Sequence, residues 1–258
     1  KADIYNLQIL KKIFLKHKPS HTVHLAAKAD TRDAVGNPYI YTKNNIEGSL
    51  NILECAKEFS IKNVVMASSS SVYGNNPRLP WKETEVADTP LSPYGATKRS
   101  MEIIAYTYHH NFDMNITCLR YFNVYGENNR PNMVPYKWAE ALLKEQEIEI
   151  SGDGSRKRDY TYVGDIVDAT ILAMKKPLGF QILNIGNTNP ISLKELLVIF
   201  EKKIGKKAKV KIRESHSASV EVTCADITKA KEMLGWEPKV SIEKGISNLV
   251  DWFRNNRL

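Results

Sequence analysis

The sequences VVMASSSSVYG (residues 64–74) and SPYGATK (residues 92–98) lie on either side of a polar, proline-rich loop. The first is an apolar run that ends in four serines, which predicts a buried strand with hydroxyl groups at its C-terminal end. The second predicts the start of a helix, because Ser92 can cap the helix and Pro93 suits its first turn. The two motifs therefore indicate a strand, a loop and a helix in succession.

Tyr94 and Lys98 stand four residues apart, so a helix places them on one face, one turn from each other. A free phenol has a pKa of about 10 and is a poor base at neutral pH. A nearby ammonium favours the phenolate, most strongly in a partly dry site. Tyr94 can then accept a proton from a substrate hydroxyl, with a serine of the preceding strand as relay. Tyr-x-x-x-Lys also occurs by chance on helix surfaces, but the serine-rich strand just upstream favours the functional interpretation.

Length and composition indicate an ordinary globular protein. The 258 residues can bury a sizeable core in one large or two interlocked domains, and the hydrophobic content is 42%. No apolar run approaches the roughly 20 residues of a membrane span, and no signal peptide is evident. The three cysteines, Cys55, Cys118 and Cys224, show no paired spacing. They fit a reducing cytoplasm and argue against a zinc site or a disulfide framework.

Five further motifs cover much of the remaining chain. They are VHLAAKA (residues 23–29), NNIEGSLNILE (residues 44–54), RYFNVYG (residues 120–126), RDYTYVGDIVDA (residues 158–169) and ADITKAKEMLGWEP (residues 225–238). With the two motifs above, they resemble the extended short-chain dehydrogenase/reductase family, and within it the nucleotide-sugar 4-epimerases that act on UDP-glucose or UDP-glucuronate. The resemblance follows the family order over nearly the whole chain, which makes it far more specific than any single motif.

The resemblance implies an α/β fold with a Rossmann-like, mostly parallel sheet and a smaller C-terminal substrate-binding domain. Residues 1–123 are expected to form the NAD-binding domain, joined by a strand near residues 181–186, and residues 124–258 mainly the substrate-binding region. Family members begin with a strand, a G-x-x-G-x-x-G turn and a helix that hold the dinucleotide pyrophosphate, about 60 residues without a counterpart before Lys1. The sequence leaves open whether the studied molecule contains that segment and retains NAD.

By the same resemblance, Ser69, Tyr94 and Lys98 are the catalytic residues and NAD is the cofactor. Ser69 is expected to relay the proton, while Lys98 tunes Tyr94 and holds the nicotinamide ribose. The implied cofactor contacts are Asp3, Ile4, Leu25, Ala26, Ala27, Lys28, Asn45, Ser68, Tyr94, Lys98, Tyr121 and Val124. Family members usually dimerise on two helices, the one that carries Tyr94 and one predicted from Pro38 to about Phe59. We therefore expect a homodimer.

The implied contacts to the UDP-sugar are Ser69, Ser70, Asn123, Arg130, Asn132, Met133, Ile150 and Arg158. Sugar 4,6-dehydratases carry an Asp-Glu pair just before V-Y-G, and decarboxylating relatives keep a Glu there. This chain has Ser70 and Ser71 at those positions, so dehydration and decarboxylation both lose support.

The signals for the sugar itself disagree. Arg130, in R-P-N-M, is similar to the arginine of glucuronate-specific epimerases, which can pair bidentately with the sugar carboxylate. Asn123, in contrast, is the residue of the UDP-glucose type. Thr223 aligns with a gate position, where a small side chain leaves room for a larger or charged substituent. His216 and Ser219 replace the usual phosphate-contact residues, and their effect stays open.

The periodicity also predicts local structure. The helix from Pro38 to Phe59 is expected to bury Ile46, Leu50, Leu53 and Ala56, and a strand is expected at residues 61–67. We expect Asp159 and Asp165 to organise a turn and to cap the helix that follows it, and Ser192 to cap the next helix. His24 is interpreted as a packed strand residue.

The formal net charge is +8, with a cluster of lysines between Lys202 and Lys211. A basic surface can attract nucleic acid or a doubly charged nucleotide sugar. No nucleic-acid motif accompanies the charge, so a generally lysine-rich surface is the preferred interpretation. We expect a UDP-sugar as the small-molecule partner, and neither nucleic acid nor membrane.

The expected reaction is inversion at C4 of a UDP-hexose through a 4-keto intermediate. UDP-glucose and UDP-galactose are the favoured substrates, and UDP-glucuronate and the N-acetyl forms stay open. Two alternatives remain: a nucleotide-sugar reductase of the same family and a non-catalytic nucleotide-sugar-binding protein. The joint presence of Tyr94, Lys98 and Ser69 argues against the latter.

Overall fold

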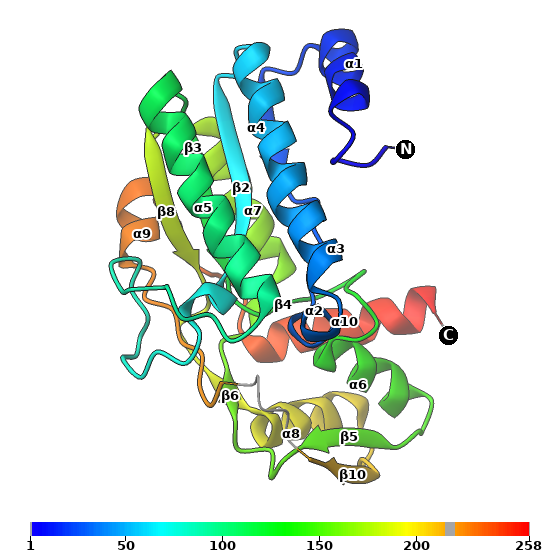
Figure 1. Cartoon of the computed structure of the whole chain (residues 1–258). Helices are drawn as coiled ribbons and strands as arrows, with labels where there is room; N and C mark the ends of the chain where they lie inside the picture. The colour runs from blue at the N-terminus through cyan, green and yellow to red at the C-terminus, as the bar shows by residue number, and fades with distance from the viewer. Residues whose placement is uncertain (1, 215–219, 258) are drawn as a thin grey trace.

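The computed structural model describes residues 2–214 and 220–257, and its upper part in Figure 1 is an α/β layered structure. Four strands form one sheet in the order β1–β2–β3–β8, and every neighbouring pair is parallel. Their bounds are β1 His21–His24, β2 Asn63–Ser69, β3 Ile116–Tyr121 and β8 Phe180–Ile185. The α/β fold with a parallel sheet that the sequence predicts is thereby confirmed.

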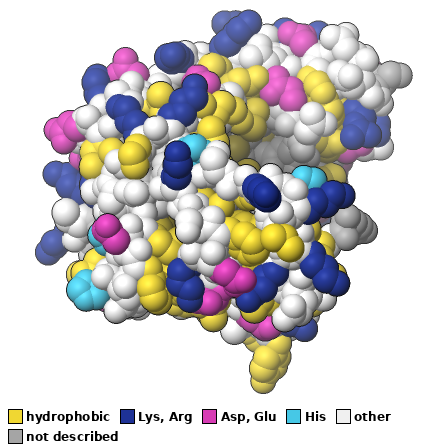
Figure 2. Space-filling view, turned by 90° about the horizontal axis from the view of Figure 1, so that it is seen from above, with side chains coloured by type: hydrophobic (Ala, Val, Ile, Leu, Met, Phe, Trp, Pro, Cys, Tyr) yellow, Lys and Arg dark blue, Asp and Glu magenta, His cyan; other side chains and the backbone are white. Residues whose placement is uncertain are grey.

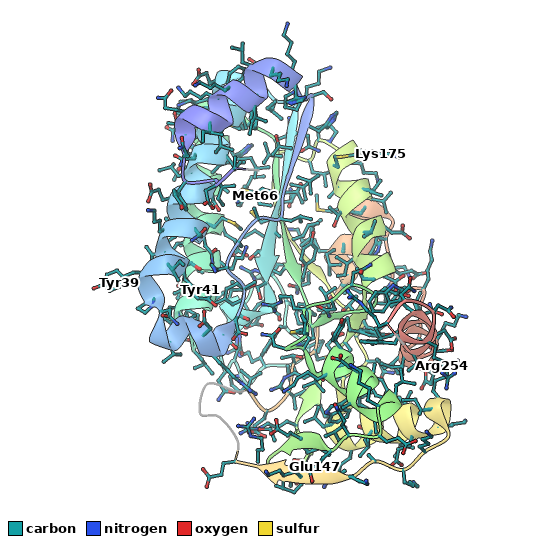
Figure 3. The ribbon with its side chains drawn as sticks, turned by 90° about the vertical axis from the view of Figure 1, so that its right-hand side faces the viewer. Tyr39, Tyr41, Met66, Glu147, Lys175 and Arg254 are labelled. Carbon is teal, nitrogen blue, oxygen red and sulfur yellow. The ribbon has the colours of Figure 1, made fainter. Side chains whose placement is uncertain are left out.

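Helices cover both faces of this sheet and so bury β2 and β3 on both sides. Val64 and Met66 pack into a cluster with α1 (Leu7–His17), α4 (Gly48–Glu58) and α5 (Pro93–Phe112). Val65 points the other way, into a cluster with α7 (Val163–Lys175) and α9 (Thr228–Leu234). Figure 3 shows Met66 in the sheet, between the helices of the two layers. The alternation along β2 thus fixes a three-layer structure.

The strand β2 runs two residues further than the sequence predicts. It begins at Asn63 and includes Ser68 and Ser69, which pair with Arg120 and Tyr121 of β3. A short 3-10 helix, η2 (Ser70–Tyr73), then leads to Gly74. Gly74 has φ +59°, and a Cβ there would lie 2.0 Å from the carbonyl oxygen of Thr89, so only glycine fits. The serines are therefore held at a rigid strand end rather than in a loop.

The helix predicted from Pro38 to Phe59 is divided into three segments. They are α3 (Pro38–Thr42), a π-helical turn η1 (Lys43–Glu47) and α4. A π-turn adds residues to one turn and so rotates the face that follows it. Leu53 and Ala56 are buried as expected, whereas Leu50 is 37% exposed and the prediction for it is wrong.

The lower part of the molecule in Figure 1 has its own core. It is built from α6 (Val134–Leu143), α8 (Leu193–Ile204), α10 (Ile242–Asn256) and the parallel pair β5 (Ile148–Ser151) and β10 (Val210–Arg213). The cap of α8 is confirmed, since Ser192 and Glu195 form a reciprocal capping box. The remaining short elements are α2 (Thr31–Gly36), β4 (Val124–Tyr125), β6 (Lys157–Arg158), β7 (Thr161–Tyr162) and β9 (Ile191–Ser192).

Two buried aspartates join separate segments. Asp159 accepts hydrogen bonds from the main-chain N–H groups of Asn187, Thr188 and Ala225. Asp165 lies inside the first turn of α7 and accepts from the N–H groups of Lys239 and Val240. The prediction that Asp165 caps its helix is therefore wrong, because a tertiary contact takes both of its oxygens.

Basic side chains are spread over the surface. In Figure 2, Lys and Arg residues are scattered over the face seen from above, and acidic and hydrophobic side chains lie between them. Many lysines and arginines also pair with carboxylates, as in the Lys203–Asp251 and Lys231–Glu237 contacts of 2.9 and 2.7 Å. Within the described residues, no helix is long and apolar enough to span a bilayer, and no group of potential metal ligands is found.

Candidate active site

A cleft of about 1500 Å³ lies at the C-terminal ends of β1, β2 and β3, between the sheet and the lower core. Parallel α/β sheets bind their ligands at this edge. Fourteen of the residues implied by the resemblance line it: Leu25, Ala27, Ser68, Ser69, Ser70, Tyr94, Lys98, Tyr121, Asn123, Val124, Arg130, Asn132, Met133 and Arg158. Residues that are far apart in the sequence are thus brought to one cavity.

Tyr94 stands in the first turn of α5, directed at the serine-bearing end of β2. Ser92 caps the helix by accepting from the N–H of Gly95 at 3.2 Å, which fixes the start of the helix. The Ser69 hydroxyl lies near the Tyr94 hydroxyl and lowers the pKa of the phenol. The Ser69 hydroxyl in turn donates to Ser71 Oγ at 3.1 Å. Two hydrogen-bonded hydroxyls, those of Ser69 and Ser71, therefore lie at the strand end beside the phenol.

Lys98 is buried one turn after Tyr94, with 4% of its surface exposed. Its Nζ donates to the carbonyl oxygen of Ala67 at 2.6 Å. An ammonium has three donors, so two remain for a ligand in the cleft. Burial lowers the pKa of Lys98 to about 8, against the opposing influence of Cys118 and Glu102.

Several groups act on the phenol of Tyr94. Burial raises its pKa, while the nearby Ser69 hydroxyl and the positive charge of Arg130 lower it. The sequence predicts that Lys98 favours the phenolate, and Arg130 is a second cation that acts in this direction. The Lys98 ammonium itself donates to the Ala67 carbonyl of β2.

Asn45, on the π-turn η1, acts on the main chain of Lys28. Its Oδ1 accepts from the Lys28 N–H at 2.8 Å, and its Nδ2 donates to the Lys28 carbonyl at 2.9 Å. Nδ2 also donates to Thr97 Oγ1 at 3.0 Å, on the first turns of α5. Asn45 thus links the segment after β1 to the helix of Tyr94 without lining the cleft itself.

The Ser68 hydroxyl points to the helix rather than into the cleft. It donates to Glu102 of α5 at 2.6 Å, although Ser68 lines the cleft with its other atoms. If Ser68 contacts the cofactor, it therefore does so through atoms other than its hydroxyl group.

Two predicted substrate residues reach across the cleft to the segment before α2. Arg130 Nη1 donates to the carbonyl oxygen of Ala29. Asn132 Nδ2 donates to Asp30 Oδ2 at 2.6 Å. The other oxygen of Asp30 caps α2 by accepting from the N–H groups of Arg32 and Asp33. These contacts connect the sheet domain to the R-P-N-M segment at the mouth of the cleft.

Asn123 and Thr223, which the sequence assigns to substrate selection, are neighbours. Thr223 Oγ1 donates to Asn123 Oδ1 at 3.4 Å and accepts from the N–H of Asp159 at 3.0 Å. Arg158 is half-buried nearby and donates to the carbonyl oxygens of Lys157 and Glu221. Its pKa is lowered, mainly by burial, and the positive charges of Arg156 and Arg32 act in the same direction. An anion between these guanidinium groups would relieve their repulsion.

Some predicted residues lie elsewhere in the described part of the chain. Asp3 accepts from the Tyr5 hydroxyl, and Ile4 packs against α4. The side chain of Ile150 is buried in the lower core, while the adjacent Ser151 lines the cleft. The remaining members that do not line the cleft are Ala26, Lys28 and Asn45. His216 and Ser219 lie outside the described residues.

Three residues of the site were not expected from the sequence. Tyr41 packs its ring edge-to-face on Tyr94, with centroids 6.4 Å apart, and donates to Asp33 at 2.9 Å. In Figure 3, Tyr41 points into the molecule and Tyr39 out of it. Glu102 and Arg120 form a buried ion pair beneath the serines. Their signal in the sequence is a charged residue inside a predicted apolar stripe, Glu102 on the face of Met101 and Ala105 and Arg120 within a buried strand.

Comparison with known proteins places these features in context. Residues 1–249 match the family model described as GDP-mannose 4,6-dehydratase. A UDP-glucuronate 4-epimerase of Thermodesulfobacterium geofontis is 46% identical over 256 residues, which cover 98% of this chain and 78% of that protein.

Solved structures agree with the sequence comparison. The UDP-glucose 4-epimerase of Thermotoga maritima, solved with UDP-glucose, superposes with a TM-score of 0.94 at 35% identity, covering 98% of this chain and 83% of that one. A UDP-glucuronic acid 4-epimerase of Bacillus cereus, in complex with UDP-glucuronic acid and NAD, gives 0.92 at 33% identity, covering 98% and 80%.

Proposed function

The chain belongs to this family of extended short-chain dehydrogenases/reductases and, within it, to the NAD-dependent nucleotide-sugar 4-epimerases. From that premise we propose that it inverts C4 of UDP-glucuronate. The observation that carries the proposal is the meeting of Tyr94, Ser69 and Lys98 at one strand end, across the cleft from Arg130. The first three suit proton transfer at a sugar hydroxyl, and the fourth suits a sugar carboxylate.

The residues present fit the nicotinamide half of NAD. Two free donors on the buried Lys98 suit the ribose hydroxyls. Leu25, Ala27, Tyr121 and Val124 form apolar cleft walls beside it. When bound, NAD would supply the acceptor and donor of the C4 hydride.

The protein's part in the reaction is a proton transfer that is made and then reversed. Tyr94, as phenolate, takes the proton from O4 while the C4–H bond breaks as hydride, which leaves a neutral 4-keto sugar. Ser69 shares the proton along its hydroxyl chain and holds O4 in place. The keto sugar then presents its other face, hydride returns to C4, and Tyr94 returns the proton to O4. Atoms and electrons balance, since one proton and one hydride leave and come back.

The substrate proposal rests on the position of Arg130. Its guanidinium stands at the mouth of the cleft and acts on Tyr94 through its charge. A carboxylate at C5 of the sugar would therefore have a cation within reach when O4 is at Tyr94. Thr223, a small residue, lines the same cleft beside Asn123. The absence of a carboxylate at Ser70 and Ser71 also favours a site that accepts an anionic sugar.

Replacement of Arg130 by glutamine tests the substrate. We expect kcat/KM for UDP-glucuronate to fall roughly 10- to 100-fold, because a hydrogen-bonded charge pair of this kind is worth about 1.5–3 kcal/mol. UDP-glucose should lose only the smaller share of turnover that follows from the higher pKa of Tyr94, so the ratio of the two substrates reports the carboxylate contact. Product analysis of both UDP-sugars, incubated with the NAD-loaded protein, measures the ratio. An equal loss on both substrates, or a parent protein that converts only UDP-glucose, would contradict the assignment to the uronate.

We also propose that the protein forms a homodimer through α4 and α5. Exposed apolar side chains on these two helices support this proposal. The two helices pack against each other and lie side by side in Figure 1. On their outer surface, Leu50, Ile103 and Tyr106 are 37%, 51% and 51% exposed. A second copy that covers these side chains would remove apolar area from water.

Sedimentation tests the homodimer. We expect the parent protein to sediment as a dimer and Ile103→Glu as a monomer, because the carboxylate would be desolvated at the interface. Val198→Glu, on the exposed side of α8 at 62% exposure, is the matched control and should stay dimeric. A parent protein that is monomeric at all concentrations would overturn the proposal.

A further inference from the structure

One turn after Lys98, α5 carries a carboxylate that is completely buried. Glu102 is 0% exposed and Arg120 of β3 is 1% exposed. The guanidinium binds the carboxylate with two parallel hydrogen bonds, Nε to Oε1 at 2.8 Å and Nη2 to Oε2 at 2.7 Å. Ser68 of β2 donates to Oε1 at 2.6 Å, and Arg99 reaches Oε2 at 3.3 Å. The carboxylate therefore has four hydrogen bonds from three elements of the fold.

These contacts join the elements that carry the reacting groups. Ser68 precedes Ser69 on β2 and is paired in register with Arg120 on β3. Glu102 lies four residues after Lys98 and eight after Tyr94, so all three share one side of α5. The guanidinium also stacks on the ring of Tyr73, 4.7 Å from its centroid. One buried charge pair thus ties the helix of Tyr94 to the strand end of Ser69.

Core packing alone does not require this pair. A buried ion pair must repay a large desolvation cost, and well-packed apolar residues of similar volume often serve stability as well or better. Arg120 also keeps one nitrogen, Nη1, buried without a hydrogen-bond partner in the described structure, a further cost. Apolar residues can slide against each other, whereas a two-pronged charge pair accepts one register only.

We propose that Glu102, Arg120 and Ser68 are positioning residues for the epimerase reaction: they set the register of α5 against β2 and β3, and so the distance from the Tyr94 hydroxyl to Ser69 and the direction of Lys98. The inference rests on the proposed function, but its geometric part concerns the protein without ligand.

The charges around Lys98 support this assignment. The groups that face its ammonium are Glu102 on α5, Cys118 on β3 and His24 on β1. Glu102 favours the charged ammonium against burial. The charge of Lys98 in turn contributes to lowering the pKa of His24 to about 4, after the larger effect of burial. Glu102 therefore helps to keep Lys98 positively charged at neutral pH, while the ammonium donates to the Ala67 carbonyl.

The test is the double variant Glu102→Leu with Arg120→Met, which replaces the pair by apolar side chains. In the NAD-loaded protein we expect kcat to fall about 10- to 100-fold, because small displacements of reacting groups have effects of that size, with little change in KM. In the ligand-free protein we expect faster amide hydrogen exchange across residues 94–102 and unchanged exchange in α10. If the pair served stability alone, a folded double variant would keep the kcat and the amide exchange of residues 94–102 of the parent protein.

Two further variants make the outcome decisive. Phe200→Leu, in the lower core at 0% exposure, lowers stability without touching α5 and should keep kcat and the exchange of residues 94–102. Ser68→Ala removes a single hydroxyl and should give the same changes as the double variant in smaller measure, even if the double variant does not fold. Parent-like exchange and kcat in both Ser68→Ala and a folded double variant would overturn the inference. If the parent protein converts no UDP-hexose, the proposed function fails, and the exchange data alone still decide the positioning role.

Discussion

Tyr94→Phe is expected to lower kcat by about 10²- to 10⁴-fold, the usual contribution of a positioned acid–base group. The substitution keeps the ring, its edge-to-face contact with Tyr41 and the helix start at Ser92. It removes only the hydroxyl that lies near Ser69. Binding of the UDP-sugar, measured by calorimetry, should therefore change little. The loss belongs to the proton transfer and not to the fold.

The pH dependence gives this prediction a second readout. Burial raises the pKa of Tyr94, and Ser69 and Arg130 act against that increase. Since the reaction needs the phenolate, kcat of the parent protein should fall as the pH is lowered. Removal of the Arg130 charge should move this decline to higher pH. Tyr39→Phe is the control, because Tyr39 is 90% exposed and points into solvent (Figure 3). A Tyr94→Phe variant that retains more than about a tenth of parent turnover would rule out this base.

Lys98→Met should combine a large loss of activity with a gain in stability. Turnover is expected to fall about 100-fold or more, since the variant loses the ammonium that we propose to hold the ribose. The ligand-free protein should become more stable at neutral pH. The folded state holds the pKa of Lys98 at about 8, below its ordinary 10.5, so the unfolded chain binds the proton more tightly. A depressed lysine therefore destabilises the fold wherever it is charged.

The size and the pH window of this effect follow from the same pKa values. The full gain is about 3 kcal/mol, reduced to about 2 kcal/mol by loss of the hydrogen bond to Ala67. It should be complete below pH 8 and disappear as the pH rises from 8 to 10.5. Urea unfolding of parent and variant at several pH values measures it. Lys203→Met, which removes a partly exposed ammonium from its pair with Asp251, is the control and should not stabilise. A Lys98→Met protein that is less stable than the parent at pH 7 would contradict the argument.

The sequence predicts the strand and the helix of the site because local signals agree there. An apolar run ending in serines and a Ser-Pro helix start need no knowledge of distant residues. The same is true of the capping box at Ser192. The α/β class and the gathering of Tyr94, Ser69 and Lys98 at one edge follow from parallel strands, whose C-terminal ends meet on one side of the sheet.

The remaining features depend on contacts that no local pattern contains. The π-turn before Gly48 rotates α4 and exposes Leu50, although a regular helix would bury it. Asp165 precedes an apolar run in the sequence, as a cap would, yet it lies inside α7 and its oxygens accept from the distant N–H groups of Lys239 and Val240. Glu102 is charged, and a charged residue on a helix is ordinarily assigned to solvent. Its partner, Arg120, is 18 residues away in the sequence and becomes adjacent only when β3 pairs with β2.

The hydrogen bonds across the mouth of the cleft have a consequence for affinity. Arg130 and Asn132 donate hydrogen bonds to Ala29 and Asp30. A UDP-sugar that binds these two side chains would replace their hydrogen bonds to Ala29 and Asp30 by new ones. The hydrogen bonds would therefore add little to the free energy of binding. Variants that remove the Asp30 carboxylate, which accepts from Asn132, would then be expected to bind the UDP-sugar more tightly.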